Sequence, residues 1–358
     1  MNDTINNTQN PYFILETAFH HEGNIEFLES LIESFKDINA NAIKFHLLFD
    51  LNDYMVANHP ALEVLRKISI PQDKWQEILE KTVNSGKEII LLCNDIESMK
   101  WVNSIQDKFP ISAIEIHSTG LNDIFLLNEA LNFKKTIIIG VGGSTFDEVQ
   151  YAVNFLKDNN KTDILLMHGF QNYPTNYSDI NLKRMLLLKE AFGLPLGYAD
   201  HTDPTDTRNE IISVLPIVSG FNIIEKHVTN VPGEKRTDAQ AAVSVEQMKG
   251  IISLAQDISK VNGVNNYELS DAEKKYGNTG PMKKAMVARL PIKKGEKITL
   301  DKIAFKRTEV SSPLLQKDLH KVIDNIAKED IAQDEILSFG NISYEFKKDD
   351  FGQFFIKK

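Results

Sequence analysis

Histidines in this sequence gather at the ends of short apolar stretches. The chain has nine histidines, and seven of them end such a stretch or closely follow it: His20, His21, His46, His117, His168, His201 and His227. Acidic residues and a lysine hold comparable places: Glu16, Lys44, Asp95, Glu115, Asp200 and Glu225. Neutral imidazole is the commonest metal ligand in proteins. If the stretches converge in the fold, the pattern predicts a divalent metal site surrounded by ionisable groups.

The stretch FNIIEKHV (221–228) shows how such a site would be built. Its first half is as apolar as a buried strand, and an acid, a base and an imidazole then follow at once. Successive side chains of a strand point to opposite faces. Glu225 and His227 should therefore share one face, and Lys226 should point the other way.

Eight apolar, β-rich stretches alternate with segments of helical periodicity. They span residues 12–19, 41–49, 88–94, 113–119, 136–143, 163–170, 194–200 and 221–228. Strands apolar along their whole length are typical of a parallel sheet covered by helices. The size and rhythm predict a (β/α)8 TIM barrel, whose chemistry lies at the carboxyl ends of the strands. An open doubly wound sheet is the alternative, but its Gly-rich phosphate turn is missing after the first stretch.

Local signals add a helix boundary and a second domain. Ser144 and Thr145 ahead of two acids predict a helix start, and 262–281 is polar and Gly/Asn-rich, as linkers are. Short strand-like runs and a Lys-Gly-Glu turn follow. We expect a polar tail (1–10), the catalytic barrel (11–261), a linker (262–281), a small mostly-β domain (282–345) and a C-terminal tail (346–358).

Composition narrows the class of protein. The net charge is −10, so a nucleic-acid-binding role has no basic footprint. No apolar stretch reaches the roughly 20 residues that cross a bilayer, which argues against a membrane partner. The N-terminus lacks the layout of a signal peptide, and the single cysteine excludes an intramolecular disulfide framework. We expect a cytoplasmic protein.

Several motifs together resemble the sialic acid synthase family, which includes the legionaminic and pseudaminic acid synthases. They are FILETAFHHEGN (13–24), NAIKFH (41–46), NYPTNYSDINL (172–182), LGYADHT (196–202) and IIEKHVT (223–229). The stretch VARLPIKKGEKITLDKIAFKR (287–307) is similar to the family's antifreeze-like (SAF) domain. The resemblance covers residues 12 to about 340, with the motifs in the family's order.

The resemblance implies a reaction and a cofactor. Members of the family condense phosphoenolpyruvate with an N-acylated hexosamine at a Mn²⁺ or Mg²⁺ site, which releases phosphate and forms a nine-carbon 2-keto acid. His201 and His227 would be the metal ligands. The metal would polarise the sugar aldehyde as a Lewis acid.

The same resemblance assigns roles to other residues. Glu16 would be the catalytic acid/base, and Lys44 would take part in catalysis and bind the donor's carboxylate or phosphate. The remaining substrate-binding candidates are His46, Ser118, Gln171, Tyr173, Asp238 and Arg307. Arg307 resembles the arginine that the SAF domain presents to a neighbouring subunit, which implies a domain-swapped homodimer.

Purely structural roles are open for the same residues. Glu16 and Lys44 could form a core ion pair, and the two candidate metal ligands could be hydrogen-bonded structural histidines. Asp238 and Arg307 could be surface charges.

The sequence departs from the family where the family binds phosphoenolpyruvate. Glu115 replaces a lysine, and a carboxylate there would repel an anion. Gly140 and Ala199 replace two serines that serve the phosphate, Gly120 replaces a glutamate, and His46 replaces a glutamine. The Gly-rich stretch GVGGST (140–145) could compensate for these lost phosphate contacts by offering backbone N–H groups to an anion. The added His46 and His117 could enlarge the metal site.

Three functions remain open from the sequence. The first is a synthase of the family's type that makes a nonulosonic acid. The second is a metal-dependent aldolase, isomerase or lyase that acts on a sugar or keto acid without phosphoenolpyruvate. The third is a catalytically silent homologue that binds a sugar. Retention of costly polar groups such as Glu16 and Lys44 argues against the silent homologue.

Overall fold

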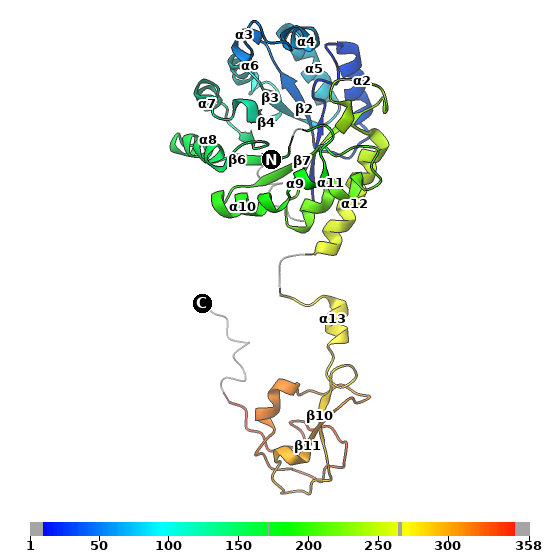
Figure 1. Cartoon of the computed structure of the whole chain (residues 1–358). Coiled ribbons are helices and arrows are strands. Elements are labelled where there is room, and N and C mark those ends of the chain that lie inside the picture. Colours follow the sequence, from blue (N-terminus) through cyan, green and yellow to red (C-terminus); the bar gives the residue numbers. More distant parts are fainter. Residues whose placement is uncertain (1–9, 171, 264–266, 348–358) are drawn as a thin grey trace. The chain divides into compact units, whose positions relative to one another are not determined.

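The structure is a computed structural model of the full chain and describes residues 10–170, 172–263 and 267–347. The chain divides into two compact units between residues 264 and 265 (Figure 1). The predicted tails lie almost entirely outside the described residues. Within the described ranges, no helix has both the length and the apolar character that a bilayer crossing requires.

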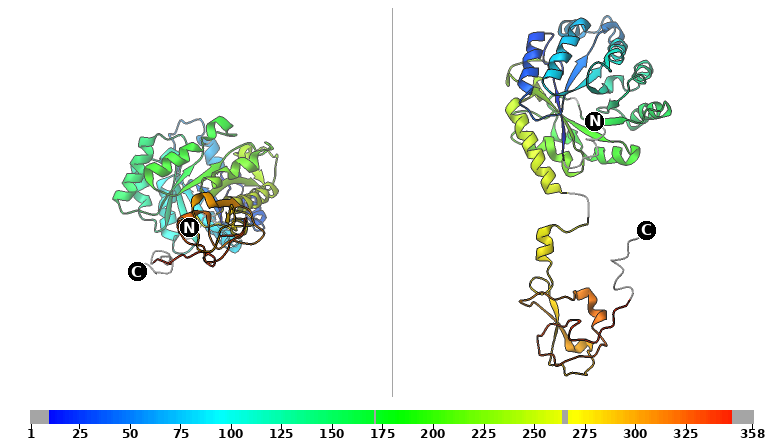
Figure 2. Two further views of the ribbon diagram at one scale, coloured as in Figure 1. Left: turned by 90° about the horizontal axis from the view of Figure 1, so that it is seen from below. Right: turned by 180° about the vertical axis from the view of Figure 1, so that it is seen from behind.

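The first unit is built on eight parallel strands that close into a barrel (Figures 1 and 2). The strands are β1 (Tyr12–Glu16), β2 (Ala42–Leu47), β3 (Glu88–Cys93), β4 (Ile111–Ile116), β5 (Thr136–Gly140), β6 (Ile164–His168), β7 (Leu196–Asp200) and β8 (Ile223–Thr229). Each pairs with the next along the chain, and β1 also pairs with β8. The predicted TIM barrel is therefore confirmed.

Helices connect the strands and surround them (Figure 2). They are α2 (Ile25–Phe35), α3 (Leu51–Tyr54), α4 (Leu62–Ile68), α5 (Gln72–Asn84), α6 (Ile96–Ile105), α7 (Ile124–Ala130), α8 (Phe146–Asp158), α9 (Tyr177–Ile180), α10 (Lys183–Phe192), α11 (Asn209–Val218) and α12 (Val245–Asn262). The predicted start of α8 is confirmed. Thr145 Oγ1 accepts a hydrogen bond from the Glu148 N–H, and the Glu148 carboxylate accepts one from the Thr145 N–H.

Alternate strand residues face the barrel interior, and an apolar cluster fills much of it. The cluster contains Tyr12, Ile14, Ala42, Ile90, Ala113, Ile138, Leu165, Met167, Ala199 and Ile223. Lys226 points to the opposite side of β8, where its ammonium lies 2.5 Å from the Asp200 carboxylate. Burial opposes the charge of Asp200, but Lys226 outweighs it and lowers the carboxyl pKa. The apolar cluster leaves only the carboxyl-terminal end of the interior for polar side chains.

The second unit is small and has its own core. Strands β10 (Ala285–Ala288) and β11 (Ile303–Lys306) pair antiparallel, and isolated bridges such as Val287 with Ile336 add further β contacts. Buried apolar side chains, among them Met286 and Leu337, pack together inside it. The predicted linker, 262–281, contains a short helix, α13 (Asp271–Tyr276).

Candidate active site

Strand register brings three ionisable side chains together at the mouth of the barrel. Glu16, the last residue of β1, lies opposite Lys44 of β2 on one side and opposite His227 of β8 on the other. All three side chains are buried. Barrel closure is what makes His227 a neighbour of Glu16, because more than 200 residues separate them in the chain.

Glu16, His201 and His227 form the group that could hold a metal ion. One ligand atom of each lies within 4.8 Å of the others. The two imidazole rings are 5.0 Å apart between centroids, and His227 Nε2 is 3.2 Å from Glu16 Oε2. Among the described residues, His201 Nδ1 has no hydrogen-bond partner although it is buried. A cation would satisfy this buried atom.

The electrostatics of this group also fit a cation. Burial, followed by the nearby charge of His227, lowers the pKa of His201 to about 3, so its imidazole is neutral at pH 7. Burial opposes the charge of Glu16, but Lys44 and His227 outweigh it and hold the Glu16 pKa well below its usual range. A neutral imidazole and an ionised carboxylate are the forms that bind metals.

Lys44 lies among three carboxyl groups just inside the mouth. Its Nζ is 2.6 Å from Glu225 Oε1, 2.9 Å from Glu115 Oε2 and 3.3 Å from Glu16 Oε1. Burial disfavours the ammonium, but these carboxyl groups raise the Lys44 pKa well above its usual value. Burial and the charge of Glu16 raise the pKa of Glu225, so Glu225 favours its neutral form. Lys44 is thus ionised, and its ammonium already contacts three carboxyl groups.

His46 and Tyr173 border the metal group from two sides. His46 Nε2 is 2.6 Å from Glu16 Oε1, so the Glu16 carboxylate lies between His46 and His227. The Tyr173 ring lies 5.2 Å from the His201 ring and 5.7 Å from the His227 ring. Burial, and then the charge of Asp238, raises the pKa of the Tyr173 phenol, which stays protonated.

The loop after β8 places Asp238 beside the mouth. Asp238 adopts a left-handed backbone conformation with φ of 61°, and its carboxylate accepts a hydrogen bond from the Phe19 N–H at 3.3 Å. His20 joins the same loop to β8, since its ring nitrogens lie 3.1 Å from the Thr237 carbonyl and 2.7 Å from Thr229 Oγ1. His20 is therefore a support of the loop rather than a metal ligand.

Ser118 lies at the end of β4, next to Gly140 of β5. A Cβ added to Gly140 would lie 3.2 Å from the Ser118 backbone nitrogen and 3.3 Å from Glu115 Oε1. Any side chain at residue 140 would thus press against Glu115. The substitutions at residues 115 and 140 are linked by this contact.

Other predicted residues lie away from the metal group or outside the described ranges. Within the described residues, the group contains neither His46 nor His117, and His117 Nδ1 lies 2.9 Å from Thr119 Oγ1. Arg307 belongs to the second unit, where its Nε donates to the Pro281 carbonyl at 2.8 Å. Gln171 lies outside the described residues.

The sequence alone does not predict the contacts of two acidic residues. Glu225 lies near a strand end and Glu115 lies where a lysine is expected, and both contact Lys44. The alternation that puts Glu225 on the same face as His227 could have identified the first. The contact of Lys44 with Glu115 depends on the register of β2, β3 and β4, which no local pattern in the sequence reveals.

Comparison with known proteins identifies a family for each of the two units. Residues 31–267 match the model of the NeuB family, and residues 283–343 match that of the SAF domain. N,N'-diacetyllegionaminic acid synthase of Campylobacter jejuni is 28% identical over 334 residues, which cover 88% of this chain and 97% of that protein. An uncharacterized protein of Methanocaldococcus jannaschii is 27% identical over 331 residues, covering 92% and 94% of the two chains.

A solved structure shares the fold. The crystal structure of N-acetylneuraminic acid (sialic acid) synthetase from Leptospira borgpetersenii superposes with a TM-score of 0.68 at 23% identity. The match covers 75% of this chain and 90% of that chain.

Replacement of His227 tests the metal assignment. His227→Ala removes one of two imidazoles, and we expect Mn²⁺ binding, measured by calorimetric titration, to weaken at least tenfold with an unchanged circular dichroism spectrum. His117→Ala is the matched control, because this histidine directly follows β4 but lies outside the ligand group; it should leave the affinity within about twofold. Undiminished Mn²⁺ binding by His227→Ala would move the site elsewhere.

Proposed function

The chain belongs to the NeuB family, and from this premise we propose that it is a metal-dependent synthase of nonulosonic acids. In the proposed reaction, the enol carbon of phosphoenolpyruvate attacks the aldehyde carbon of an N-acylated hexosamine, whose oxygen takes up a proton and becomes a hydroxyl group. Water adds to the phosphate-bearing carbon, and phosphate leaves as the 2-keto group forms. The observation that carries the proposal is the buried group of Glu16, His201 and His227 at the mouth of a family-type barrel. Relatives with synthase names, such as the Campylobacter jejuni enzyme, support the same reaction class.

The chemistry of each side chain suggests a different role in the proposed reaction. His201 and His227 would hold a Mn²⁺ or Mg²⁺ ion, which as a Lewis acid polarises the sugar aldehyde. Glu16 is ionised and lies between two imidazoles, so it can accept or return a proton beside the reacting carbons. Tyr173 and Asp238 border the space where the sugar would bind, and their hydroxyl and carboxylate can orient its hydroxyl groups.

Lys44 would bind the carboxylate or phosphate of phosphoenolpyruvate. To do so, its ammonium has to give up one or more of its present contacts with carboxyl groups. Its ammonium is shared by three carboxyl groups in the structure. The neutral form of Glu225 reduces the negative charge that an incoming anion meets. Ser118, His46 and Gln171 complete the proposed substrate contacts, with Gln171 outside the described residues.

A specific observation supports a second candidate function. Glu115 directs a carboxylate at Lys44 from 2.9 Å, and Gly140 and Ala199 offer no hydroxyl groups for a phosphate. Several charge-assisted contacts, each worth about 1.5–3 kcal/mol, would then be missing for phosphoenolpyruvate. The alternative is a metal-dependent aldolase, isomerase or lyase that acts on a sugar or keto acid.

Phosphate release distinguishes the two candidates. We expect the protein with Mn²⁺, phosphoenolpyruvate and a panel of N-acylated hexosamines to release inorganic phosphate only when a suitable sugar is present. Removal of the metal with a chelator should abolish the release. Glu16→Gln keeps the size of the side chain but removes the proton acceptor, so turnover should fall by at least a hundredfold. No sugar-dependent phosphate with any hexosamine would favour the second candidate.

Residue 115 provides a graded test of donor binding. Glu115→Gln removes a negative charge near Lys44, and Glu115→Lys replaces it with a positive one. We expect affinity for phosphoenolpyruvate to rise from wild type to Gln to Lys, by roughly tenfold or more over the series. The affinity is measured by calorimetry, with circular dichroism as a check on folding. Unchanged or absent binding in both variants would count against a phosphoenolpyruvate site here.

The resemblance also leads us to propose a domain-swapped homodimer, in which Arg307 of one subunit reaches the sugar bound to the other. The Arg307 side chain is exposed in its own unit, as a residue that serves a neighbour must be. Light scattering over a range of protein concentrations should give a mass of two chains. A mass of one chain at all concentrations would rule the dimer out.

A further inference from the structure

The sheet holds the two candidate metal ligands, His201 and His227, in different ways. The pairing of β7 with β8 ends at Asp200 and Lys226, and His201 lies one residue beyond the end of β7. His227 lies within β8, where it pairs with the end of β1. Hydrogen bonds between strands therefore fix the backbone at His227, whereas the position of His201 depends on other contacts.

The residues that directly precede the two histidines form a buried ion pair. Lys226 Nζ lies 2.5 Å from Asp200 Oδ2, and both side chains are fully buried. Ala199 faces the barrel interior, so strand alternation points the side chain of Asp200 outward, behind the metal group. The reaction described so far gives neither member of the pair a role.

The Asp200 carboxylate joins the end of β7 to its surroundings. Oδ1 accepts hydrogen bonds from the Tyr198 hydroxyl at 3.1 Å and from the Thr202 N–H at 3.0 Å. Oδ2 accepts from Thr202 Oγ1 at 3.0 Å and from Ser213 Oγ of α11 at 2.6 Å, in addition to the ammonium of Lys226. One carboxylate thus connects β7, the loop that follows it, α11 and β8.

This carboxylate also encloses His201 in a short turn. The hydrogen bond from the Thr202 N–H to Asp200 Oδ1 spans His201, which lies between the two residues. On its other side, the His201 carbonyl accepts a hydrogen bond from the Thr175 N–H at 2.9 Å. The backbone of His201 is therefore held by Asp200 and by the loop after β6.

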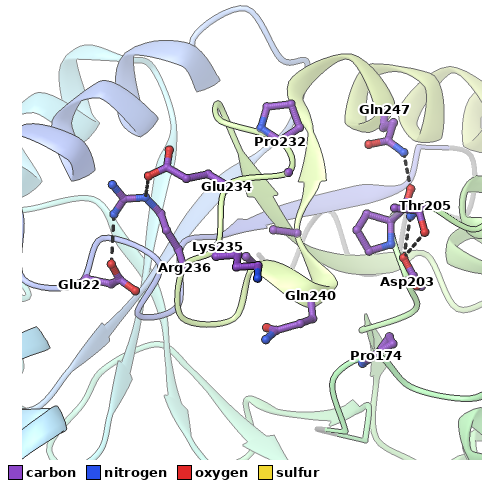
Figure 3. Close-up of a pocket in the computed structure, with 14 residues that line it drawn as sticks. Glu22, Pro174, Asp203, Thr205, Pro232, Glu234, Lys235, Arg236, Gln240 and Gln247 are labelled. Carbon is purple, nitrogen blue, oxygen red and sulfur yellow. Dashed lines mark hydrogen bonds and ion pairs between the residues drawn. The ribbon is translucent and has the colours of Figure 1, made fainter.

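The chain after Thr202 is fastened to a second helix (Figure 3). The Asp203 carboxylate accepts hydrogen bonds from the N–H and the hydroxyl of Thr205 at 2.8 and 2.7 Å. Gln247 of α12 donates to the Pro204 carbonyl at 2.7 Å. The loop after β7 is thus a fixed support for the turn at His201.

Lys226 supplies the link from this turn to β8. Besides Asp200, its Nζ approaches Thr202 Oγ1 at 3.4 Å. Apolar side chains of similar volume often give a stability equal to or greater than that of a buried ion pair. An ion pair, however, fixes the distance between two strands, because each buried charge loses its compensation when the strands separate. Its advantage here lies in geometry.

We propose that Asp200 and Lys226 are positioning residues that hold His201 and His227 at the spacing needed to bind one metal ion. The two imidazole rings lie 5.0 Å apart between centroids with this pair behind them. A site held in this way has less order to gain when the ion binds. The inference rests on the proposed function insofar as the two histidines bind a metal.

Lys226→Met separates positioning from charge. The variant removes a positive charge behind the metal group and leaves Asp200 negative, so electrostatic attraction alone would strengthen the binding of a cation. Loss of the link between the strands predicts the opposite. We expect Mn²⁺ affinity, measured by calorimetric titration of the full chain, to fall roughly tenfold or more. Tighter binding of Mn²⁺ would overturn the proposal.

A double variant separates positioning from stability. Asp200→Asn combined with Lys226→Met leaves no buried ion unpaired, and asparagine can still accept the Thr202 N–H. We expect a melting temperature close to that of the wild type, but Mn²⁺ affinity still reduced roughly tenfold. The electron paramagnetic resonance lines of bound Mn²⁺ should broaden as the ligand geometry becomes less uniform. Mn²⁺ affinity equal to that of the wild type would overturn the proposal.

Tyr12→Phe is the matched control. Tyr12 is buried at the opposite end of β1 from Glu16, and its hydroxyl donates to the Glu88 carboxylate at 2.7 Å. Loss of this buried hydrogen bond should lower the melting temperature and leave Mn²⁺ affinity within about twofold. A fall in affinity as large as that of the Lys226 variant would assign the effect to general destabilisation and overturn the proposal.

Phosphate release separates this inference from the proposed reaction. Weaker Mn²⁺ binding in the variants, without any phosphate release by the wild type, would retain the positioning pair and remove the synthase. Sugar-dependent phosphate release by the wild type, with the same Mn²⁺ affinity in the variants, would retain the synthase and remove the positioning role.

Discussion

The ion cluster around Lys44 is the constraint on which the rest of the barrel mouth depends. One ammonium is shared by three carboxyl groups in a space closed to water. Removing one partner of a buried ion pair typically costs about 3–5 kcal/mol, because the remaining charge is left uncompensated. Even with Glu225 neutral, acidic groups still outnumber the ammonium. A cation held by His201 and His227 next to Glu16 would offset this remaining negative charge.

The same cluster connects the donor side of the site with its departures from the family. Glu115 can lie at 2.9 Å from Lys44 with Gly140 as its neighbour, because any side chain at residue 140 would crowd its carboxylate. Glu115 and Gly140 are therefore coupled by direct contact, and a side chain at residue 140 would require the Glu115 carboxylate to shift.

Two kinds of element position the candidate site. Glu16 and His227 lie opposite each other on paired strands, whose backbone hydrogen bonds fix their positions. The loops that follow β6 and β8 add Tyr173 and Asp238 beside these strand residues. Binding residues on loops above a rigid scaffold are a common arrangement in TIM barrels.

The sequence by itself determined the strands, their order and the residues at their ends. Apolar runs reveal buried parallel strands, alternation puts Glu225 and His227 on one face, and the Thr145–Glu148 pair marks a helix start; these are local properties of the chain. Only the tertiary structure decided which side chains meet. The contacts of Lys44 with Glu115 and Glu225 and the position of Glu16 between two imidazoles depend on strand register and barrel closure. Such contacts join residues far apart in the chain, and no local pattern specifies their distances.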